Sequence, residues 1–298
     1  MKKIINAPET YVDDMLKGIY AAHGDQVKYA EGDLRCYCTA NKKPGKVAII
    51  TGGGKAKSIG YGVATAYAKE GANLAITGRN EQKLLDAKEE LERLYGIKVL
   101  PIVADVNADE ESEQVVKDTV KKVYDTFGRI DVLINNAQAS ASGVPLAMQT
   151  KDHFDLALYS GLYATFYYMR ECYPYLKETQ GSVINFASGA GFFGNAGQCS
   201  YAAAKEGIRG LSRVAATEWG KDNINVNIVA PLAMTSQLEN FKMAYPEAYE
   251  KNVKAVPMGH FGDPEKDIGR VCVLLGSPDF KYMSGETLTL EGGMGQRP

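Results

Sequence analysis

From Lys46 to its end, the sequence alternates short apolar runs with longer segments that carry one apolar face. Apolar runs of strand length that alternate with helical segments indicate a parallel β-sheet with helices on both faces. We therefore predict an α/β fold built on a doubly wound parallel sheet. The expected strands span residues 46–51, 73–77, 99–104, 131–134, 182–186, 224–229 and 287–290.

The helices expected between these strands span residues 61–69, 81–95, 110–127, 153–176, 198–221 and 267–275, whereas residues 237–262 are less regular. Ligands of open parallel sheets bind beyond the carboxyl ends of the strands. The loops that follow the strands are therefore where a functional site is expected.

Residues 1–45 precede this pattern and are predicted to form an N-terminal helical extension. Val12, Met15, Leu16 and Ile19 are spaced i, i+3, i+4 and i+7, which places them on one face of a helix. Such a helix needs a surface to cover, on its own chain or on a partner subunit. We therefore predict two units, the extension at residues 1–45 and a larger domain at residues 46–298.

The composition limits the classes of partner. The chain has a net charge of -2 and no apolar run of membrane-spanning length, so we expect neither nucleic acid nor a membrane as partner. The N-terminus has no apolar stretch typical of a signal peptide, and a soluble, cytoplasmic protein is expected. Cys36 and Cys38 could form half of a metal site, but no second ligand pair matches them, so no metal is expected.

The first strand is followed by the glycine-rich turn TGGGKAKSIGYG, which runs from Thr51 to Gly62. Glycines let the backbone approach a pyrophosphate, and the free N–H groups of the following helix can bind it. The turn therefore predicts a dinucleotide site, although a simple tight turn would have a similar composition.

Polar residues follow the next three strands. Asp105 ends the third strand and could accept a hydrogen bond from an adenine amino group. Asn136 and Ala137 follow the fourth strand, although asparagine is also a common turn residue. Arg79 ends the second strand, where an acidic residue would bind a ribose 2′-hydroxyl. Arg79 could bind the 2′-phosphate of NADP(H), or it could stack on the adenine of NAD(H).

The segment from Ser188 to Lys205 carries a candidate proton-transfer site. Tyr201 and Lys205 are four residues apart, which makes them neighbours on one helical face. A lysine ammonium roughly 4 Å away would favour tyrosinate by on the order of 4 kcal/mol at an effective dielectric constant near 20. This attraction would lower the tyrosine pKa by about three units, less the cost of desolvation. The alternative is a packed aromatic ring and a solvated charge.

Together these features resemble the short-chain dehydrogenase/reductase family over residues 46–298. The resemblance includes the turn from Pro231 to Thr235 after the sixth strand, and the segment SGETLTLEGG. It implies a Rossmann-type fold, hydride transfer with a nicotinamide cofactor, and a homotetramer. It also implies that Ser188 holds the substrate oxygen, that Tyr201 transfers the proton, and that Lys205 binds the nicotinamide ribose and lowers the tyrosine pKa.

Three sets of site residues follow from the loops and from this resemblance. The catalytic set is Ser188, Tyr201 and Lys205. The cofactor set is Gly52, Ser58, Ile59, Gly60, Arg79, Asp105, Val106, Asn136, Ala137, Tyr201, Lys205, Pro231 and Thr235. The substrate set is Ser188, Tyr201, Phe193 and Leu238, of which the last two belong to an apolar group that could instead be ordinary core and lid residues.

Three positions depart from the family pattern. Ser58 stands where the middle glycine of the turn usually falls, and that form is similar to the turn of enoyl-acyl-carrier-protein reductases. Those enzymes space their tyrosine and lysine more widely than Tyr201 and Lys205, which argues against that branch. Gln138 replaces the glycine that usually follows Asn-Asn-Ala. Gly161 aligns with the helix asparagine that holds a water in the proton relay of the family. A water, Ser160 or a backbone carbonyl would have to replace that side chain.

Two narrower resemblances extend the prediction. The extension resembles the start of dihydroxyacetone kinase subunits. The whole chain is most similar to the gut-bacterial 20β-hydroxysteroid dehydrogenases, which implies reduction of a side-chain ketone such as that of cortisol. This similarity tips the cofactor expectation narrowly to NAD(H), with NADP(H) as the alternative from Arg79. The alternative functions are a 3-oxoacyl thioester or sugar reductase, and a non-catalytic dinucleotide-binding scaffold.

Overall fold

The structure is a computed structural model that describes residues 45–106 and 111–295. The predictions for the N-terminal extension, including its helix and the Cys36–Cys38 pair, lie outside the described residues. The division into two units therefore stays a prediction.

The sheet is the predicted one. It contains seven parallel strands in the order β3-β2-β1-β4-β5-β6-β7. This order reverses between β1 and β4, as in a Rossmann-type doubly wound fold, and the predicted fold class is confirmed. The strands are β1 (Val47–Thr51), β2 (Asn73–Gly78), β3 (Val99–Val103), β4 (Val132–Asn135), β5 (Ser182–Phe186), β6 (Asn225–Pro231) and β7 (Thr287–Leu290).

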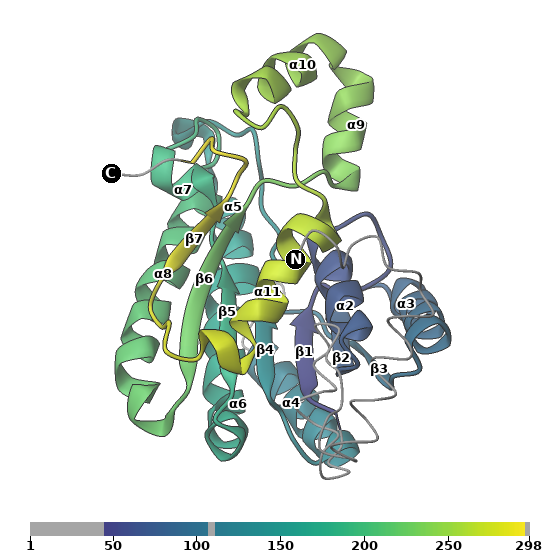
Figure 1. The fold of residues 1–298 in the computed structure, drawn as a ribbon. Helices are drawn as coiled ribbons and strands as arrows, with labels where there is room; N and C mark the ends of the chain where they lie inside the picture. Colours follow the sequence, from purple (N-terminus) through teal and green to yellow (C-terminus); the bar gives the residue numbers. More distant parts are fainter. Residues whose placement is uncertain (1–44, 107–110, 296–298) are drawn as a thin grey trace, which may run out of the picture. The chain divides into compact units, whose positions relative to one another are not determined.

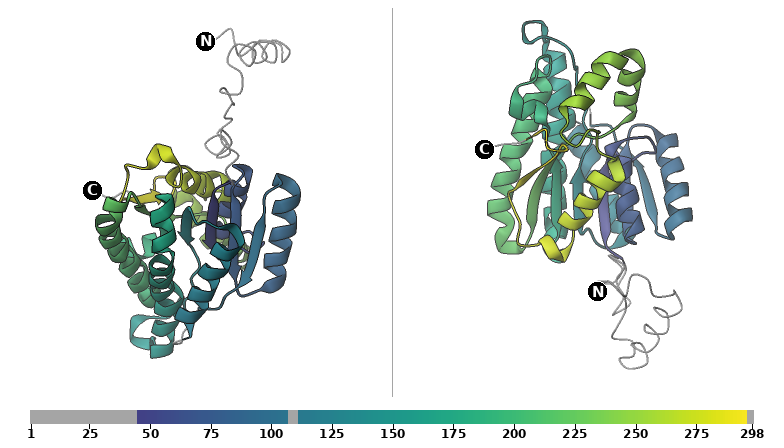
Figure 2. Two further views of the ribbon diagram at one scale, coloured as in Figure 1. Left: turned by 90° about the horizontal axis from the view of Figure 1, so that it is seen from below. Right: turned by 45° about the horizontal axis from the view of Figure 1, so that its top comes forward.

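Helices cover both faces of the sheet (Figures 1 and 2). Helices α4, α6 and α8 pack on one face, and α2, α3 and α11 lie on the other. The helices are α2 (Ile59–Lys69), α3 (Glu81–Tyr95), α4 (Ser112–Phe127), α5 (Lys151–Ala157), α6 (Ala164–Thr179), α7 (Gly189–Phe193), α8 (Cys199–Trp219), α9 (Ser236–Ala244), α10 (Pro246–Ala255) and α11 (Arg270–Leu275).

The central strands form the core because nearly every one of their residues is removed from water. All five residues of β1 and all five of β5 are buried. Strands covered on both faces read as continuous apolar runs. This is why the strand pattern could be recognised in the sequence.

The single helix expected at residues 153–176 is instead two helices joined by a π-helical segment, Leu158–Tyr163. The hydroxyl of Ser160 donates to the carbonyl of Leu156 (2.5 Å) and accepts from the amide of Ala139 (2.9 Å). Gly161 follows directly. A polar side chain that bonds outside the helix and a glycine together favour such an irregularity.

Residues 237–262, which were expected to be irregular, contain most of α9 and all of α10. Thr235 caps α9 by accepting from the amide of Leu238, and Pro246 occupies the first turn of α10. Neither helix has a buried residue. The apolar spacing that normally reveals a helix is therefore weak in this segment. Both helices form a lobe beyond the carboxyl ends of the strands (Figure 1).

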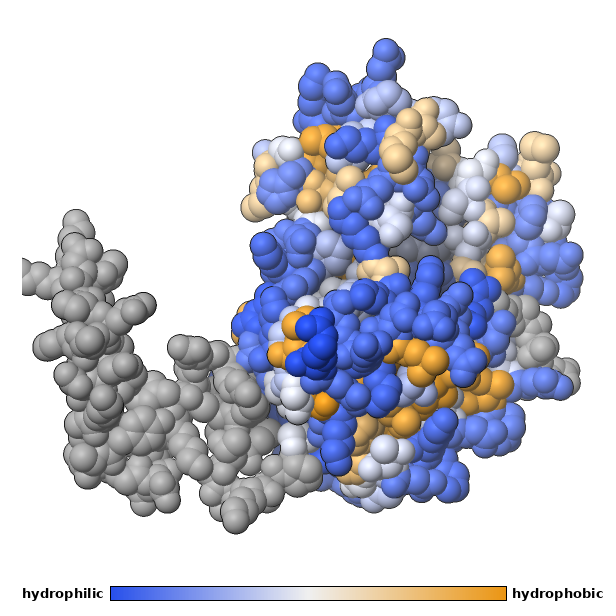
Figure 3. Space-filling model, turned by 90° about the vertical axis from the view of Figure 1, so that its right-hand side faces the viewer, coloured by the Kyte–Doolittle hydropathy of each residue, from blue (hydrophilic) through white to orange (hydrophobic). Residues whose placement is uncertain are grey.

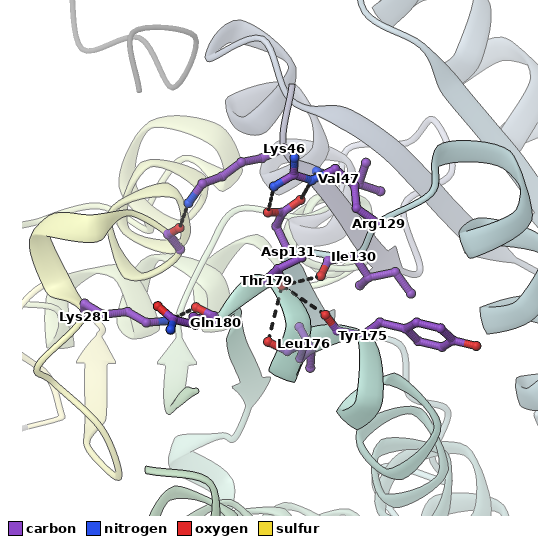
Figure 4. Close-up of polar contacts among 11 residues, drawn as sticks. Lys46, Val47, Arg129, Ile130, Asp131, Tyr175, Leu176, Thr179, Gln180 and Lys281 are labelled. Atoms are coloured by element: carbon purple, nitrogen blue, oxygen red, sulfur yellow. Dashed lines mark hydrogen bonds and ion pairs between the residues drawn. The ribbon is translucent and has the colours of Figure 1, made fainter. Parts of the chain in front are cut away.

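A polar cluster holds the opposite end of the sheet (Figure 4). The carboxylate of Asp131, which is 3% exposed, accepts from the amide of Val47 (2.9 Å) and from two nitrogens of Arg129 (2.8 and 2.6 Å). The ammonium of Lys281 donates to the carbonyls of Gln180 and Gly181 at the end of α6. The Asp131 contacts join the start of β1 to the approach to β4, and Lys281 binds the turn between α6 and β5.

We predict that Asp131→Ala lowers the free energy of unfolding by about 2–4 kcal/mol, because it leaves the buried amide of Val47 unpaired and removes the counter-charge of Arg129. Chemical denaturation monitored by circular dichroism measures the change. Asp125→Ala is the matched control. It breaks the exposed pair between Lys121 and Asp125, and should cost about 0.5 kcal/mol or less. Equal losses in the two variants would contradict the role given to Asp131.

Candidate active site

The turn between β1 and α2 is a close-packed glycine cradle. Gly52 has a φ of +73°, and a Cβ added there would lie 2.9 Å from the side-chain nitrogen of Asn136. A Cβ at Gly60 would lie 2.2 Å from the carbonyl oxygen of Gly52. Ser58 caps α2 by accepting from the amide of Tyr61 (3.3 Å), and no acidic residue stands in the first turn of the helix. The cradle therefore offers backbone N–H groups to an anion.

A cavity of about 490 Å³ lies at this cradle, within the size range of ligand sites. Most of the predicted cofactor residues line it. They are Gly52, Ser58, Ile59, Gly60, Arg79, Asp105, Val106, Asn136, Ala137 and Thr235. The structure thus brings together residues that are up to 183 positions apart along the chain, from the ends of four strands and the start of α9. An adenine, a ribose and a pyrophosphate fit this set of donors and close backbone approaches.

The lobe of α9 and α10 is tied to the glycine turn. The backbone amide and the hydroxyl of Ser236 both donate to the carbonyl oxygen of Lys57, at 2.8 and 3.1 Å. The ammonium of Lys57 also pairs with Glu239 on α9. Seen from the α3 side, the molecule is hollowed beneath this lobe (Figure 3). The lobe therefore forms one wall of the cavity.

Thr51, at the end of β1, is a site residue that we did not assign from the sequence. Its hydroxyl oxygen accepts from the amides of Asn136 and Ala137, both at 2.9 Å. Its carbonyl oxygen accepts from the side chain of Asn136 at 2.9 Å. These bonds hold the end of β4 against the end of β1. A hydroxyl residue in the last position of a buried apolar strand was the signal that could have revealed it.

Ser188, Tyr201 and Lys205 come together near the ends of β5 and α8. Ser188 follows β5 and caps α7 by accepting from the amide of Ala190 (3.2 Å), and its hydroxyl lies close enough to Tyr201 to favour a lower tyrosine pKa. The ammonium nitrogen of Lys205 lies 5.4 Å from the centre of the Tyr201 ring. The same nitrogen donates to the carbonyl oxygen of Phe186 at 2.8 Å. The predicted catalytic set therefore forms one cluster.

Burial controls the charge of this cluster. Lys205 is 3% exposed, and burial lowers its pKa to about 7. Burial also raises the pKa of Tyr201, and the nearby hydroxyl of Ser188 only opposes that rise. The expected lowering of the tyrosine pKa by Lys205 is wrong for this structure. Desolvation disfavours both charged forms, and a lysine with a pKa near 7 is only partly charged at neutral pH.

The remaining predicted residues do not line the cavity that the structure describes. Pro231 ends β6, where it pairs with Leu290, and is partly exposed. Leu238 is partly buried on α9, and Phe193 on α7 is 52% exposed. Ser188, Tyr201 and Lys205 are also absent from that wall. The cofactor set therefore divides into a cavity group and three residues outside that wall, Tyr201, Lys205 and Pro231.

Large hydrophobic side chains are exposed on the loops and helices beyond the carboxyl ends of the strands. They come from the segment after β4, from α7, and from the region of α9 and α10. The exposed members are Leu146, Met148, Phe193, Met243, Tyr245 and Met258. Exposed apolar side chains in these segments can contact an apolar ligand or partner. Among the described residues, no group of three or more histidine, cysteine or acidic side chains could hold a metal ion, and no helix could cross a membrane.

Comparison with known proteins gives consistent matches. A family model described as Enoyl-(Acyl carrier protein) reductase matches residues 53–295. A protein named 12alpha-hydroxysteroid dehydrogenase from a Clostridium species is 86% identical over 254 residues, which cover 85% of this chain and 98% of that protein. The 3-oxoacyl-[acyl-carrier-protein] reductase FabG of Thermotoga maritima is 34% identical over 255 residues, covering 84% and 98% of the two chains. The solved structure of levodione reductase has a TM-score of 0.77 at 31% identity, and the match covers 84% of this chain and 97% of that one.

The buried Lys205 predicts a pH-dependent stability. Its pKa of about 7 in the folded protein lies below the ordinary value of 10.5, so the unfolded chain binds more protons between those two pH values. The contribution of Lys205 to the free energy of unfolding must therefore rise with pH through that window.

We predict that the stability of the wild type relative to Lys205→Met rises by a few kcal/mol, on the order of 1.4 kcal/mol per pKa unit, as the pH increases from 7 to 10.5. Urea denaturation at a series of pH values measures this difference. Lys254→Met, at an exposed position on α10, is the control and should show no such rise. A flat difference for Lys205→Met would show that the amine is not desolvated.

Proposed function

The chain belongs to the short-chain dehydrogenase/reductase family of NAD(P)-dependent oxidoreductases, and from that premise we propose that it interconverts a 12α-hydroxysteroid and the corresponding 12-oxosteroid. The observation that carries the proposal is the 86% identity to a protein named 12alpha-hydroxysteroid dehydrogenase, over 98% of that protein. The expected oxidoreductase activity is confirmed by the family. The expected 20β position gains no support from these relatives, because the relative named as acting on a steroid acts at position 12α.

The catalytic cluster supports proton transfer at a secondary alcohol or ketone. Ser188 can donate a hydrogen bond to the substrate oxygen, and Tyr201 can transfer the proton to or from that oxygen. Lys205, held by the carbonyl of Phe186 and 5.4 Å from the centre of the Tyr201 ring, would bind the nicotinamide ribose. When bound, the nicotinamide cofactor supplies or accepts the hydride.

The exposed apolar side chains beyond the carboxyl ends of the strands support a steroid substrate over a thioester. A flat hydrophobic ring system would bury side chains such as Phe193, Met243 and Tyr245, which are 52%, 74% and 62% exposed. A substrate that bears a phosphopantetheine group would instead favour a basic patch at the mouth of the site. A 3-oxoacyl thioester is the second candidate substrate, because relatives at 31–34% identity include several 3-oxoacyl-[acyl-carrier-protein] reductases. The homotetramer that the family implies stays a prediction.

We predict that the purified protein oxidises a 12α-hydroxysteroid at least about tenfold faster than its 12β epimer. In the reverse direction, it should reduce the 12-oxosteroid at least about tenfold faster than cortisol or an acetoacetyl thioester. Tyr201→Phe should lower kcat at least about a hundredfold, the usual contribution of a general acid or base. Cofactor absorbance at 340 nm follows both reactions. Phe241→Tyr, an aromatic exchange on α9 outside the catalytic cluster, serves as the control for handling and folding. Faster turnover of cortisol or the thioester than of the 12α-hydroxysteroid would refute the proposed substrate.

We further propose that NADP(H) is the preferred cofactor. Arg79, Lys57 and Lys83 line the cavity, and Asp105 is the one carboxylate among the described residues that line it. Arg79 follows directly on β2, where an acidic side chain would select the ribose 2′-hydroxyl of NAD(H). The narrow expectation of NAD(H) rested on a resemblance to 20β enzymes that the relatives do not support. The local positive charge therefore favours NADP(H), because cations at this end of the cavity attract a 2′-phosphate.

We predict that Arg79→Ala raises the KM for NADPH about 10- to 100-fold, the effect of one charge-assisted hydrogen bond, and changes the KM for NADH less than threefold. Initial rates with each cofactor at saturating steroid measure both values. Arg93→Ala, which removes an exposed arginine near the end of α3, should leave both unchanged. An equal rise in the KM for NADPH and for NADH would mean that Arg79 does not bind the 2′-phosphate.

A further inference from the structure

Two positions that depart from the family pattern occupy one volume. A Cβ added at Gly161 would lie 2.6 Å from the side-chain carbonyl carbon of Gln138 and 2.8 Å from both its Nε2 and its Oε1. Contacts below 3.0 Å are essentially never made by real Cβ atoms. A side chain at position 161 would therefore require the Gln138 carboxamide, the end of a flexible side chain, to move from its present place. The glutamine that follows Asn-Asn-Ala therefore packs in the space left by the absent side chain of the helix glycine.

The backbone on both sides of Gln138 is held in place. The amide of Ala137 donates to the hydroxyl of Thr51, and the amide of Ala139 donates to the hydroxyl of Ser160, both at 2.9 Å. Ser160 thus bonds to the backbone of the loop and of its own helix, so it does not replace an asparagine at position 161. A loop fixed at both neighbours directs the Gln138 side chain to a defined place in the cavity wall.

The Gln138 carboxamide is buried, and its oxygen accepts no hydrogen bond from the described residues. Its Nε2 donates to the carbonyl of Ala157 at 3.4 Å, which is a long bond. Its Oε1 is buried and has no hydrogen-bond partner among the residues that the structure describes. Leaving such an atom unpaired is destabilising, so a buried oxygen of this kind calls for a donor. Because Gln138 also lines the cavity, the site itself can supply that donor.

The π-helical segment connects Gln138 to the catalytic helix. Leu162, next to Gly161, packs against Gly207 on α8, where an added Cβ would lie 2.8 Å from the leucine side chain. Gly207 is two residues beyond Lys205. The ammonium of Lys205 has three donors, and one is bonded to Phe186. The helix that carries Gly161 is thus packed directly on the helix that positions Tyr201 and Lys205.

We propose that Gln138 is a positioning residue of the reaction. Its carboxamide oxygen accepts a hydrogen bond from the side of α8, directly or through one water, and so holds the Tyr201–Lys205 pair in place for proton transfer. Glycine is required at position 161 because the carboxamide fills the space of a side chain there. This inference rests on the proposed oxidoreductase function but not on the identity of the steroid.

A double-mutant cycle tests the pair. Gln138→Met, which keeps the length of the side chain and removes the acceptor, should lower kcat about tenfold or more and change the KM values for cofactor and steroid less than twofold. Gly161→Ala should lower kcat to a similar extent, because its Cβ displaces the carboxamide. In a Gln138→Gly background, Gly161→Ala should have no further effect on kcat. Gly161→Asn in that background should restore part of the lost rate by returning a carboxamide to the same volume.

Gly210→Ala is the matched control for Gly161→Ala. Both glycines lie in helical segments, but a Cβ at Gly210 would meet no atom within 4 Å. Its kcat should be unchanged, and its melting temperature should rise slightly because alanine favours a helix. Thermal melts of all variants, recorded without substrate, report the packing part of the proposal independently of activity.

The outcomes separate the two proposals. If the wild type does not oxidise the 12α-hydroxysteroid, the proposed substrate fails, and the cycle is run with whichever ketone the wild type reduces. If the wild type is active but the effects of Gln138→Gly and Gly161→Ala on kcat are additive, the positioning role of Gln138 is refuted. A loss in Gln138→Met that appears as a lower melting temperature, with kcat unchanged, would likewise show a purely structural glutamine.

Discussion

One threonine hydroxyl sets the geometry of the site. The Thr51 oxygen accepts from two successive amides at the end of β4, and so it joins the two strands between which the strand order reverses. The crevice of a doubly wound sheet opens at this point. With the backbone after β4 held so close, residue 52 has space only for glycine, because a Cβ there would meet Asn136. Gly60 is constrained in turn by the carbonyl of Gly52. The glycine pattern is therefore a consequence of how closely β1 and β4 are joined.

Desolvation, rather than charge attraction, dominates the catalytic cluster. Lys205 and Tyr201 are adjacent, yet burial shifts both pKa values toward the neutral forms. A group that must change its charge in such a place depends on hydrogen-bond partners that stabilise the charged form. Ser188 and the carbonyl of Phe186 provide two of them. The buried oxygen of Gln138 is a third acceptor: it lies on the loop after β4, against the π-helical segment that packs on α8. The positions of these neutral groups, more than the spacing of tyrosine and lysine, determine how readily the pair ionises.

The sequence predicted the sheet well because its strands are covered on both faces and leave continuous apolar runs, as in β1 and β5. It also predicted ten residues that share one cavity, because glycines and polar residues after strands carry a local signal. Helices α9 and α10 were missed since neither buries a residue, so no apolar stripe marks them. The pKa of Tyr201 was predicted in the wrong direction because a spacing along a helix gives the distance between charges but not their burial. Thr51 was missed because its role depends on β4, more than eighty residues away.

Gln138 and Gly161 show why departures from a motif should be considered together. Taken singly, each departure is unfavourable. The glutamine adds bulk where a close turn is usual, and the glycine removes a polar side chain from a helix. In the structure, the added carboxamide and the removed side chain are in the same place. The packing density of a protein interior leaves no room for both, and an unfilled space there would be destabilising. A second glycine at position 138 would leave such a space, and an asparagine at position 161 would need the glutamine to move. A side chain at position 161 would therefore displace the carboxamide that Gln138 contributes from the loop after β4.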